Sequence, residues 1–264
     1  MSVVSGKTTQ RIALVTGASS GIGKAFAEEY AKLGVDLVIV ARRIEPLNEL
    51  ADRLRTQYQV TVKVLSADLS DPQTPQALFD ALLKKAIRIN ILVNNAGYGV
   101  PGELCDIEWP RHRDTIEVMA TAPVRMCYLF APLMRNQGAG HIINVSSLAA
   151  LLPPHAGGTL YYPVKSFLHQ FSIAFRAEMR AHKVHVTSLC PGFTRTGFQA
   201  AAGGSVETVA VPKWTWSDPN AVARTAIRAV DKNKAVCVPG LINKVIAMAF
   251  KLLPGSVGRV LVGG

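Results

Sequence analysis

The stretch Arg11-Ile-Ala-Leu-Val-Thr16, followed directly by Gly17-Ala-Ser-Ser-Gly-Ile-Gly23, predicts the fold of this 264-residue chain. The first part is a short apolar run typical of a buried strand, and residues 24 to 33 continue with amphipathic helical spacing. Glycines at such a junction let the backbone approach a pyrophosphate, which then faces the N–H groups of the helix N-terminus. The spacing departs from the G-x-G-x-x-G template, so a plain tight turn is the alternative.

A second strand is predicted at residues 35 to 40, and it ends in Ala41-Arg42-Arg43. In dinucleotide-binding folds an acidic residue near this point binds the ribose 2′-hydroxyl of NAD, whereas an arginine suits the 2′-phosphate of NADP. Because the acid is missing and two arginines are present, we expect NADP(H) to be preferred over NAD(H). The alternative is that both arginines are solvated residues opening the helix predicted at residues 44 to 57.

Strands and helices continue to alternate along the chain. Further strands are predicted at residues 60–66, 89–93, 184–189 and 235–239, and further helices at 72–85, 114–136, 161–182 and 218–232. This alternation predicts an α/β fold, in which one Rossmann-type, doubly wound domain of parallel strands over residues 11–240 carries helices on both faces. Residues 1–10 are expected to form a flexible tail.

Ligands of such sheets bind beyond the carboxyl ends of the strands. Asp68 and Asn94 each follow a predicted strand directly, so we expect both on this rim. The Asp68 carboxylate can accept a hydrogen bond from an adenine amine, or it can cap the following turn.

Tyr161 and Lys165 lie four residues apart in the helix predicted at 161–182, which places both side chains on one helical face. A nearby ammonium favours phenolate, so we expect the pKa of Tyr161 to fall below its ordinary value of about 10. Such a phenol can exchange a proton with a carbonyl or an alcohol near neutral pH.

Five motifs, taken together and in order, resemble the short-chain dehydrogenase/reductase family. They are Thr16-Gly-Ala-Ser-Ser-Gly-Ile-Gly23, Asn94-Asn-Ala-Gly97, Ser146-Ser147, Tyr161-x-x-x-Lys165 and Pro191-Gly192. The resemblance covers residues 11 to 238. It implies about seven parallel strands, hydride transfer between a nicotinamide and a carbonyl or secondary alcohol, and a homodimer or homotetramer.

The resemblance also implies roles for single residues. Tyr161 would be the proton donor in reduction, Lys165 would hold the nicotinamide ribose, and Ser147 would polarise the substrate oxygen. Of the two serines, Ser147 is preferred to Ser146 because its sequence distance from Tyr161 is nearer to the distance between serine and tyrosine in the family. Thr194 and Thr196 would bind the nicotinamide carboxamide. The full set of expected cofactor contacts is Gly17, Ser19, Ser20, Gly21, Ile22, Arg42, Arg43, Asp68, Leu69, Asn94, Ala96, Gly97, Tyr161, Lys165, Pro191, Gly192, Thr194 and Thr196.

Met119 departs from the family pattern, which places there an asparagine that helps a relay water reach the lysine. A thioether cannot donate a hydrogen bond. Either Thr121 or another water serves as the relay, or the chain is a weakly active or non-catalytic NADP(H)-binding regulator. We favour activity because Ser147, Tyr161 and Lys165 are all present.

Substrate specificity is expected between residues 197 and 217, directly after the cofactor loop. The segment begins with Gly and Ala and ends near Trp214 and Trp216, which favours a lid over a cleft. The alternative is that both tryptophans dock the segment on the core without touching substrate. Four other side chains near the rim suggest an apolar pocket for a lipophilic carbonyl or alcohol, such as a steroid, aryl or fatty compound: Phe193, Leu148, Leu152 and Tyr162.

Residues 241–264 are expected to form an apolar C-terminal helix and tail carrying Lys244 and Lys251. Three fates stay open: packing on a neighbouring subunit or the core, covering the substrate cleft, or lying on a membrane surface as a basic amphipathic helix. We expect neither a transmembrane segment nor a signal peptide, because no apolar run has the required length.

The net charge of +11 comes from Lys and Arg spread along the chain, which is typical of a solvated basic surface and also attracts a phosphate-bearing ligand. No basic patch is interleaved with aromatics, so nucleic acid is not a predicted partner. Four cysteines without a C-x-x-C pair predict reduced thiols and a cytoplasmic protein. The histidines lack metal-ligand spacing, so no metal is expected, and His155 faces either a loop surface or the substrate.

Overall fold

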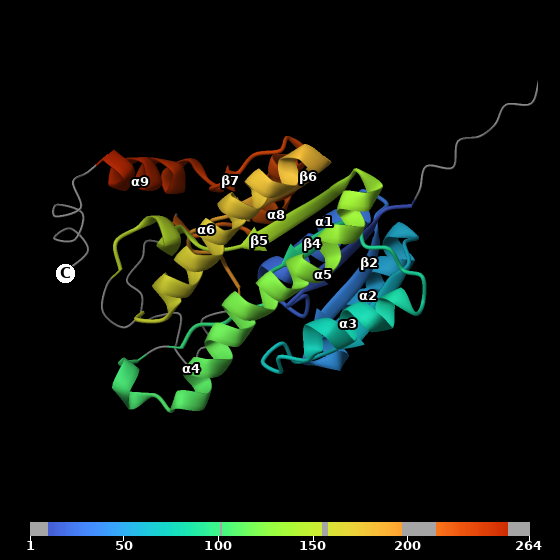
Figure 1. Cartoon of the computed structure of the whole chain (residues 1–264), viewed down its shortest axis with the longest axis horizontal. Coiled ribbons are helices and arrows are strands. Elements are labelled where there is room, and N and C mark those ends of the chain that lie inside the picture. Colours follow the sequence, from blue (N-terminus) through green and yellow to red (C-terminus); the bar gives the residue numbers. More distant parts are fainter. Residues whose placement is uncertain (1–9, 101, 155–157, 197–214, 253–264) are drawn as a thin grey trace, which may run out of the picture.

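The computed structural model describes residues 10–100, 102–154, 158–196 and 215–252. Within them, a parallel seven-stranded sheet has the order β3-β2-β1-β4-β5-β6-β7 (Figure 1). Its strands are β1 (Ile12–Thr16), β2 (Asp36–Ala41), β3 (Val62–Ser66), β4 (Ile91–Asn94), β5 (Gly140–Val145), β6 (Val184–Leu189) and β7 (Val236–Cys237). The predicted doubly wound α/β fold is confirmed.

Helices cover both faces of the sheet. The α-helices are α1 (Gly21–Lys32), α2 (Ile44–Tyr58), α3 (Thr74–Leu83), α4 (Trp109–Ile116), α5 (Ala122–Gln137), α6 (Tyr161–Met179), α8 (Pro219–Asp231) and α9 (Leu241–Leu252), and short 3-10 turns are η1 (Leu104–Asp106), η3 (Leu148–Leu151) and η4 (Arg180–His182). One core contains α1, α2 and α8, and the other contains α3, α5 and α6.

The strands alternate between the two cores. In β2, Leu37 and Ile39 pack against one layer of helices, whereas Val38 and Val40 pack against the other. Successive side chains of a strand point to opposite faces, so a strand covered on both sides must be apolar throughout. This is why the central strands appear in the sequence as continuous apolar runs.

The strand register brings all the functional motifs to one edge of the sheet. Thr16 pairs with Val40, Asn94 with Asn144, and Val145 with Leu189. The glycine loop, the two arginines, the Asn-Asn-Ala-Gly motif and the serine pair each follow one of these strands, so they share the carboxyl edge. The chain reverses its direction of strand addition between β1 and β4, and such a switch point is where open α/β sheets bind ligands.

The helix predicted at 114–136 differs from the structure in length and form. The helical rod begins at Trp109 and contains a π-helical turn, η2 (Glu117–Thr121), between α4 and α5. The rod from Trp109 to Gln137 is long and apolar enough to cross a membrane, but 56% of its most apolar window is buried inside the fold. That burial is typical of a core helix.

Several predictions fall on residues outside the described ranges. These are the N-terminal tail over 1–9, His155, most of the predicted lid with Trp214, and the tail over 253–264. Trp216 is described, and its ring lies 5.6 Å from that of Phe193 between centroids.

Candidate active site

The glycine loop after β1 is packed so closely that side chains are excluded. Gly17 has φ +66°, and a Cβ built on it would lie 2.9 Å from the Cα of Ala96. A Cβ on Gly21, where φ is +56°, would lie 2.9 Å from the side chain of Thr196. The loop therefore contacts both the segment after β4 and the segment after β6, which places three sequence motifs around one site.

Thr16 and Asn95 hold the loops after β1 and β4 together. The backbone N–H groups of Asn95 and Ala96 donate to Thr16 Oγ1 at 2.9 and 3.1 Å, and Asn95 Nδ2 donates to the Thr16 carbonyl at 2.9 Å. Our sequence interpretation quoted both residues within motifs without giving either a role. The signal available was their position, since each lies where a central strand ends.

Asn94 was expected on the rim just past a strand, whereas it is still part of the strand and its side chain points away from the rim. It is the last residue of β4 and is buried, and its Nδ2 donates to Asn144 Oδ1 at 2.8 Å and to the Pro123 carbonyl at 3.3 Å. The side chain points into the core because strand residues alternate in direction, so only the backbone of Asn94 faces the edge of the sheet.

Arg42 and Arg43 lie at the carboxyl end of β2 and are both exposed. Within the described ranges, neither forms an ion pair with an acidic residue. Asp68 caps the turn after β3, since its Oδ1 accepts from the Ser70 N–H at 3.0 Å. A carboxylate has a second oxygen, so this capping is compatible with a ligand contact.

The two neighbouring serines after β5 have different surroundings. Ser146 Oγ is buried and donates to the backbone carbonyl of Lys165 at 2.7 Å. Ser147 Oγ accepts from the Ala149 N–H at 3.1 Å and is hydrogen-bonded to the side chain of Tyr161. Ser147 therefore lies beside the phenol, whereas Ser146 joins β5 to α6.

Lys165 is buried, and its Nζ donates to the Val145 carbonyl at 3.0 Å and lies 5.8 Å from the ring centroid of Tyr161. Burial lowers the pKa of Lys165 to about 8, and the neighbouring Cys190 acts in the opposite direction. Burial raises the pKa of Tyr161, although the hydrogen bond from Ser147 acts to lower it. The predicted lowering of the Tyr161 pKa is therefore wrong for this structure, because desolvation of the phenolate dominates.

Met119, which we expect to stand in place of the family's asparagine, lies in the core near Gly97. It is buried in the π-helical turn, and a Cβ built on Gly97 would lie 3.1 Å from its Sδ and 3.6 Å from Lys165 Nζ. Met119 is thus a close neighbour of the lysine. Thr121 is exposed and hydrogen-bonds with Glu117, so the idea that its hydroxyl replaces the missing relay group is wrong.

The loop after β6 is held between the serine segment and α9. The Leu148 N–H donates to the Pro191 carbonyl at 2.8 Å, and Thr194 Oγ1 donates to the Gly192 carbonyl at 3.0 Å. A Cβ on Gly192 would lie 2.4 Å from Asn243 Oδ1, so this buried residue of α9 packs directly on the loop. Sequence reasoning missed Asn243, because a lone Asn in an apolar helix carries no motif.

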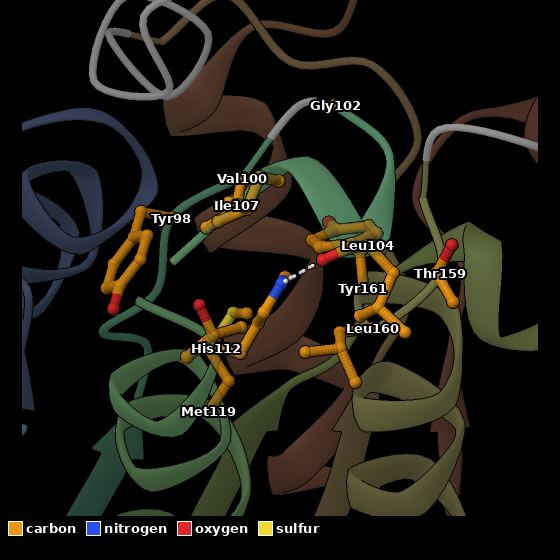
Figure 2. A pocket seen from close by; sticks show the side chains of 11 residues that line it. Tyr98, Val100, Gly102, Leu104, Ile107, His112, Met119, Thr159, Leu160 and Tyr161 are labelled. Atoms are coloured by element: carbon orange, nitrogen blue, oxygen red, sulfur yellow. Dashed lines mark hydrogen bonds between the residues drawn. The ribbon is translucent and has the colours of Figure 1, made fainter. Parts of the chain in front are cut away.

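A small hollow lies beside Tyr161 (Figure 2). Its apolar wall comes from Val100, Leu104, Ile107 and Leu160, and Met119 and His112 close one side. The predicted lining residues Phe193, Leu148, Leu152 and Tyr162 are not part of this hollow as the described residues form it. The segment between β4 and α4 supplies most of the wall instead, and it carries no motif that would have indicated this.

The residues present fit a dinucleotide. A glycine turn, in which Gly17 and Gly21 leave no room for a side chain, leads into the N-terminus of α1, and two exposed arginines follow β2. No group of three His, Cys, Asp or Glu side chains in the described part of the chain is placed to hold a metal ion. The edge therefore combines a place for phosphates with a buried phenol, a hydroxyl and an amine.

Comparison with known proteins identifies the class of enzyme that this fold and site define. A family profile described as short chain dehydrogenase matches residues 11–205. The chain belongs to the short-chain dehydrogenase family, and it is an oxidoreductase.

Individual relatives are identical to the chain at about a third of the aligned positions. It is 34% identical over 200 residues to an NADP-dependent 3-hydroxy acid dehydrogenase of Schizosaccharomyces pombe, which covers 75% of each chain. It is 31% identical over 252 residues to a very-long-chain 3-oxoacyl-CoA reductase of Anas platyrhynchos, which covers 92% of this chain and 76% of the relative. A solved short-chain dehydrogenase from Sphingobium yanoikuyae, in complex with NADPH, superposes with a TM-score of 0.83 at 31% identity over 96% of each chain.

Proposed function

We propose that this oxidoreductase transfers hydride between NADP(H) and a lipophilic carbonyl compound or the corresponding secondary alcohol. The observation that carries the proposal is the meeting of Ser147, Tyr161 and Lys165 at the carboxyl edge of the sheet, beside a glycine turn. A 3-hydroxy acid dehydrogenase and a 3-oxoacyl-CoA reductase among the relatives support this reaction type.

The side chains divide the proton chemistry among them. A reduced nicotinamide, when bound, supplies the hydride that adds to the carbonyl carbon. Ser147 donates a hydrogen bond to the carbonyl oxygen, and Tyr161 gives that oxygen its proton, so the C=O double bond becomes a C–OH group. Tyr161 is left as phenolate, which the neighbouring Lys165 stabilises when it is charged and which regains its proton from solvent. Alcohol oxidation runs through the same groups in reverse.

The choice of NADP(H) over NAD(H) is supported by Arg42 and Arg43. Both guanidinium groups are exposed at the end of β2. Their guanidinium N–H groups can donate paired, charge-assisted hydrogen bonds to a 2′-phosphate. A 2′-hydroxyl is uncharged and has a single oxygen, so it would gain less from the same groups. The relatives described as NADP-dependent and as bound to NADPH point to the same cofactor.

The lipophilic substrate class is supported by the aliphatic wall of the hollow beside Tyr161. Val100, Leu104, Ile107 and Leu160 offer no charge to compensate an ionic group, so an apolar chain or ring suits this wall, while the other lining residues Tyr98, Thr115 and Thr159 carry hydroxyl groups. The presence of Met119 beside Lys165 is the observation that favours the second candidate, a weakly active NADP(H)-binding regulator.

The direct test is NADPH oxidation with a panel of aryl, steroid and long-chain ketones, followed through the absorbance of the reduced nicotinamide. We expect turnover by the wild type and a loss of at least about a hundredfold in Tyr161→Phe, which keeps the ring but not the proton. Tight NADPH binding with no oxidation across the panel would instead support the regulator, and Met119→Asn would then be expected to raise the rate.

We also propose that α9 contacts an anionic lipid surface. Leu241, Val245, Met248 and Leu252 follow a spacing of four, three and four residues, which places them on one helical face, and each is between 57% and 77% exposed. Lys244 and Lys251 flank this face, and no acidic residue follows Asp231 in the sequence. An apolar stripe beside lysines is complementary to an anionic bilayer.

The family resemblance also implies a homodimer or homotetramer. This oligomeric state stays a prediction, which analytical ultracentrifugation of the purified protein would test.

A further inference from the structure

Asn243 is a buried amide in a helix whose other side chains are more exposed. Of the described side chains of α9, only that of Asn243 is buried, at 6% exposed, whereas Leu241 and Val245 of the same helix are 77% and 60% exposed. Its Nδ2 donates to the Pro239 carbonyl at 2.8 Å, and this hydrogen bond fixes the orientation of the amide. The proposed hydride chemistry gives Asn243 no role.

The amide of Asn243 lies directly against the backbone of Gly192. A Cβ built on Gly192 would lie 2.7 Å from both Cγ and Nδ2 of Asn243, which is closer than a real Cβ approaches any heavy atom. The turn into α9 is fitted to the same amide, since Gly240 has φ +85° and its Cβ would lie 3.3 Å from Nδ2. Gly192 therefore has no room for a side chain while Asn243 keeps this position.

The loop after β6, in which Gly192 lies, is tied to the rest of the candidate site on both sides of this glycine. Just before it, the Pro191 carbonyl accepts from the Leu148 N–H at 2.8 Å. Further along the loop, the side chain of Thr196 lies so close to the glycine loop that a Cβ on Gly21 would be 2.9 Å from it. A shift of the backbone at Gly192 would therefore disturb the place for a dinucleotide.

We propose that Asn243 positions the loop after β6 for binding of the dinucleotide. The inference rests on the proposed function and adds to it a residue outside the motifs. Asn243 acts through the backbone of Gly192, so it is a positioning residue and not a catalytic one. Without its amide the loop is free to adopt other positions, and the cofactor must order the loop at the moment of binding, which weakens affinity.

The first test is the affinity of the full chain for NADPH, measured by titration calorimetry. Asn243→Ala should raise Kd about tenfold, the cost of ordering roughly one backbone residue. Asn243→Ser should raise Kd as much, although a serine hydroxyl can still donate to the carbonyl four residues earlier and so preserve the start of α9. Ile242→Ala is the matched control, because this neighbour in α9 is 39% exposed, and its Kd should equal that of the wild type.

Steady-state kinetics should show the same defect. In both Asn243 variants KM for NADPH should rise about tenfold, whereas kcat at saturating NADPH should stay within about threefold of the wild type, because the groups that move the proton are unchanged. General loss of structure would instead lower kcat by reducing the amount of folded enzyme.

A double-mutant cycle tests the contact itself. Gly192→Ala alone should weaken NADPH binding at least about tenfold, because its methyl group and the Asn243 amide cannot occupy the same space. In the Asn243→Ala background the three atoms closest to that methyl group are gone, so Gly192→Ala should then cost less than about threefold. An equal loss in both backgrounds would overturn the inference, since the cofactor itself would then require the glycine.

The remaining outcomes separate this inference from the proposed function. Weaker NADPH binding in the Asn243 variants, with no oxidation of NADPH by the wild type on any carbonyl compound, would contradict the hydride transfer and leave the positioning role standing. Turnover by the wild type with an unchanged Kd in both variants would overturn the positioning role alone. A lower Tm with an unchanged Kd would do the same, because Asn243 would then only hold α9 in place. A wild type that binds no NADPH would contradict both.

Discussion

Ser146 and Ser147 show how adjacent identical residues acquire different roles. The chain leaves β5 in an extended conformation, so consecutive side chains point in opposite directions. Ser146 turns inward to the backbone of α6, and Ser147 turns toward Tyr161. Sequence spacing favoured Ser147, and its position beside the phenol supports the same choice.

Replacing each serine with alanine should therefore give two different defects. Ser147→Ala should lower kcat by about a hundredfold, because one donor to the developing oxyanion is lost, and should also reduce the free energy of unfolding by about 1 kcal/mol, because the cap of η3 is lost. Ser146→Ala should leave kcat within a few-fold of wild type and reduce the free energy of unfolding by about 1 kcal/mol, because a buried hydrogen bond is lost. Steady-state kinetics and urea denaturation of both variants provide the check, and the reverse ranking in kcat would contradict the assignment.

Lys165 predicts a specific dependence of stability on pH. Its pKa in the folded protein is about 8, against an ordinary value of 10.5, so between these values the unfolded chain binds one proton more. Stability then rises with pH across this window, and burial of the charged amine costs the folded protein most below pH 8. Lys165→Met should be more stable than wild type at pH 7 in the absence of cofactor.

This gain should shrink as the pH rises from 8 towards 10.5, because the wild-type amine becomes neutral in both states. Denaturant titration of both proteins across that range measures the difference directly, and contributions from other groups cancel. A gain independent of pH would mean that packing, and not the charge, dominates at this position.

At the scale of single elements, α9 is the helix for which the sequence allowed the most alternative positions. Figure 1 shows it at one end of the molecule, away from α2 and α3. Asn243 packs its inner face on Gly192, and the helix contacts η3, which follows Ser147. Its apolar stripe does not pack on the core of this chain, so of the three fates considered, core packing is wrong for the four exposed side chains.

We expect α9 to bind vesicles that contain phosphatidylglycerol. The double variant Val245→Glu/Met248→Glu should lower binding more than tenfold in cosedimentation, because two exposed apolar groups that would insert into the bilayer are lost and two charges that anionic lipid repels are gained. Leu33→Glu/Leu83→Glu is the matched control, since these leucines are 57% and 56% exposed at the carboxyl ends of α1 and α3. Binding should also weaken in salt and on uncharged vesicles. If the α9 variant binds vesicles like the wild type but has a lower molecular mass in analytical ultracentrifugation, the stripe is a subunit interface and the lipid proposal is wrong.

At the scale of the whole molecule, the loops that follow most of the parallel strands lie at one edge of the sheet. A single dinucleotide bound there would contact several of these loops at once. The loops after β1, β4, β5 and β6 already contact one another at the carboxyl edge. A dinucleotide bound there would join both halves of the sheet, and a ligand at a hundred times its Kd adds about 2.7 kcal/mol to the stability of the fold.

NADPH should therefore raise Tm by about 5 °C or more in a single transition, and NADH at the same concentration should raise it less. Arg42→Ala should remove most of the difference between the two cofactors, because the 2′-phosphate loses a charge-assisted bond. Arg88→Ala is the control, since this exposed arginine precedes β4 at the opposite edge of the sheet. An unchanged difference in Arg42→Ala would show that Arg42 does not select the cofactor.

Most of the fold could be predicted from the chain alone, because strands buried on both faces are continuous apolar runs and their helices have a clear 3.6-residue period. The glycine loop, the Tyr161–Lys165 pair and the arginines could be found for the same reason: their chemistry depends on local spacing. The inward turn of Asn94, the exposure of Thr121 and the raised pKa of Tyr161 could not. Each depends on which residues from distant segments surround a side chain, and burial arises only when those segments pack.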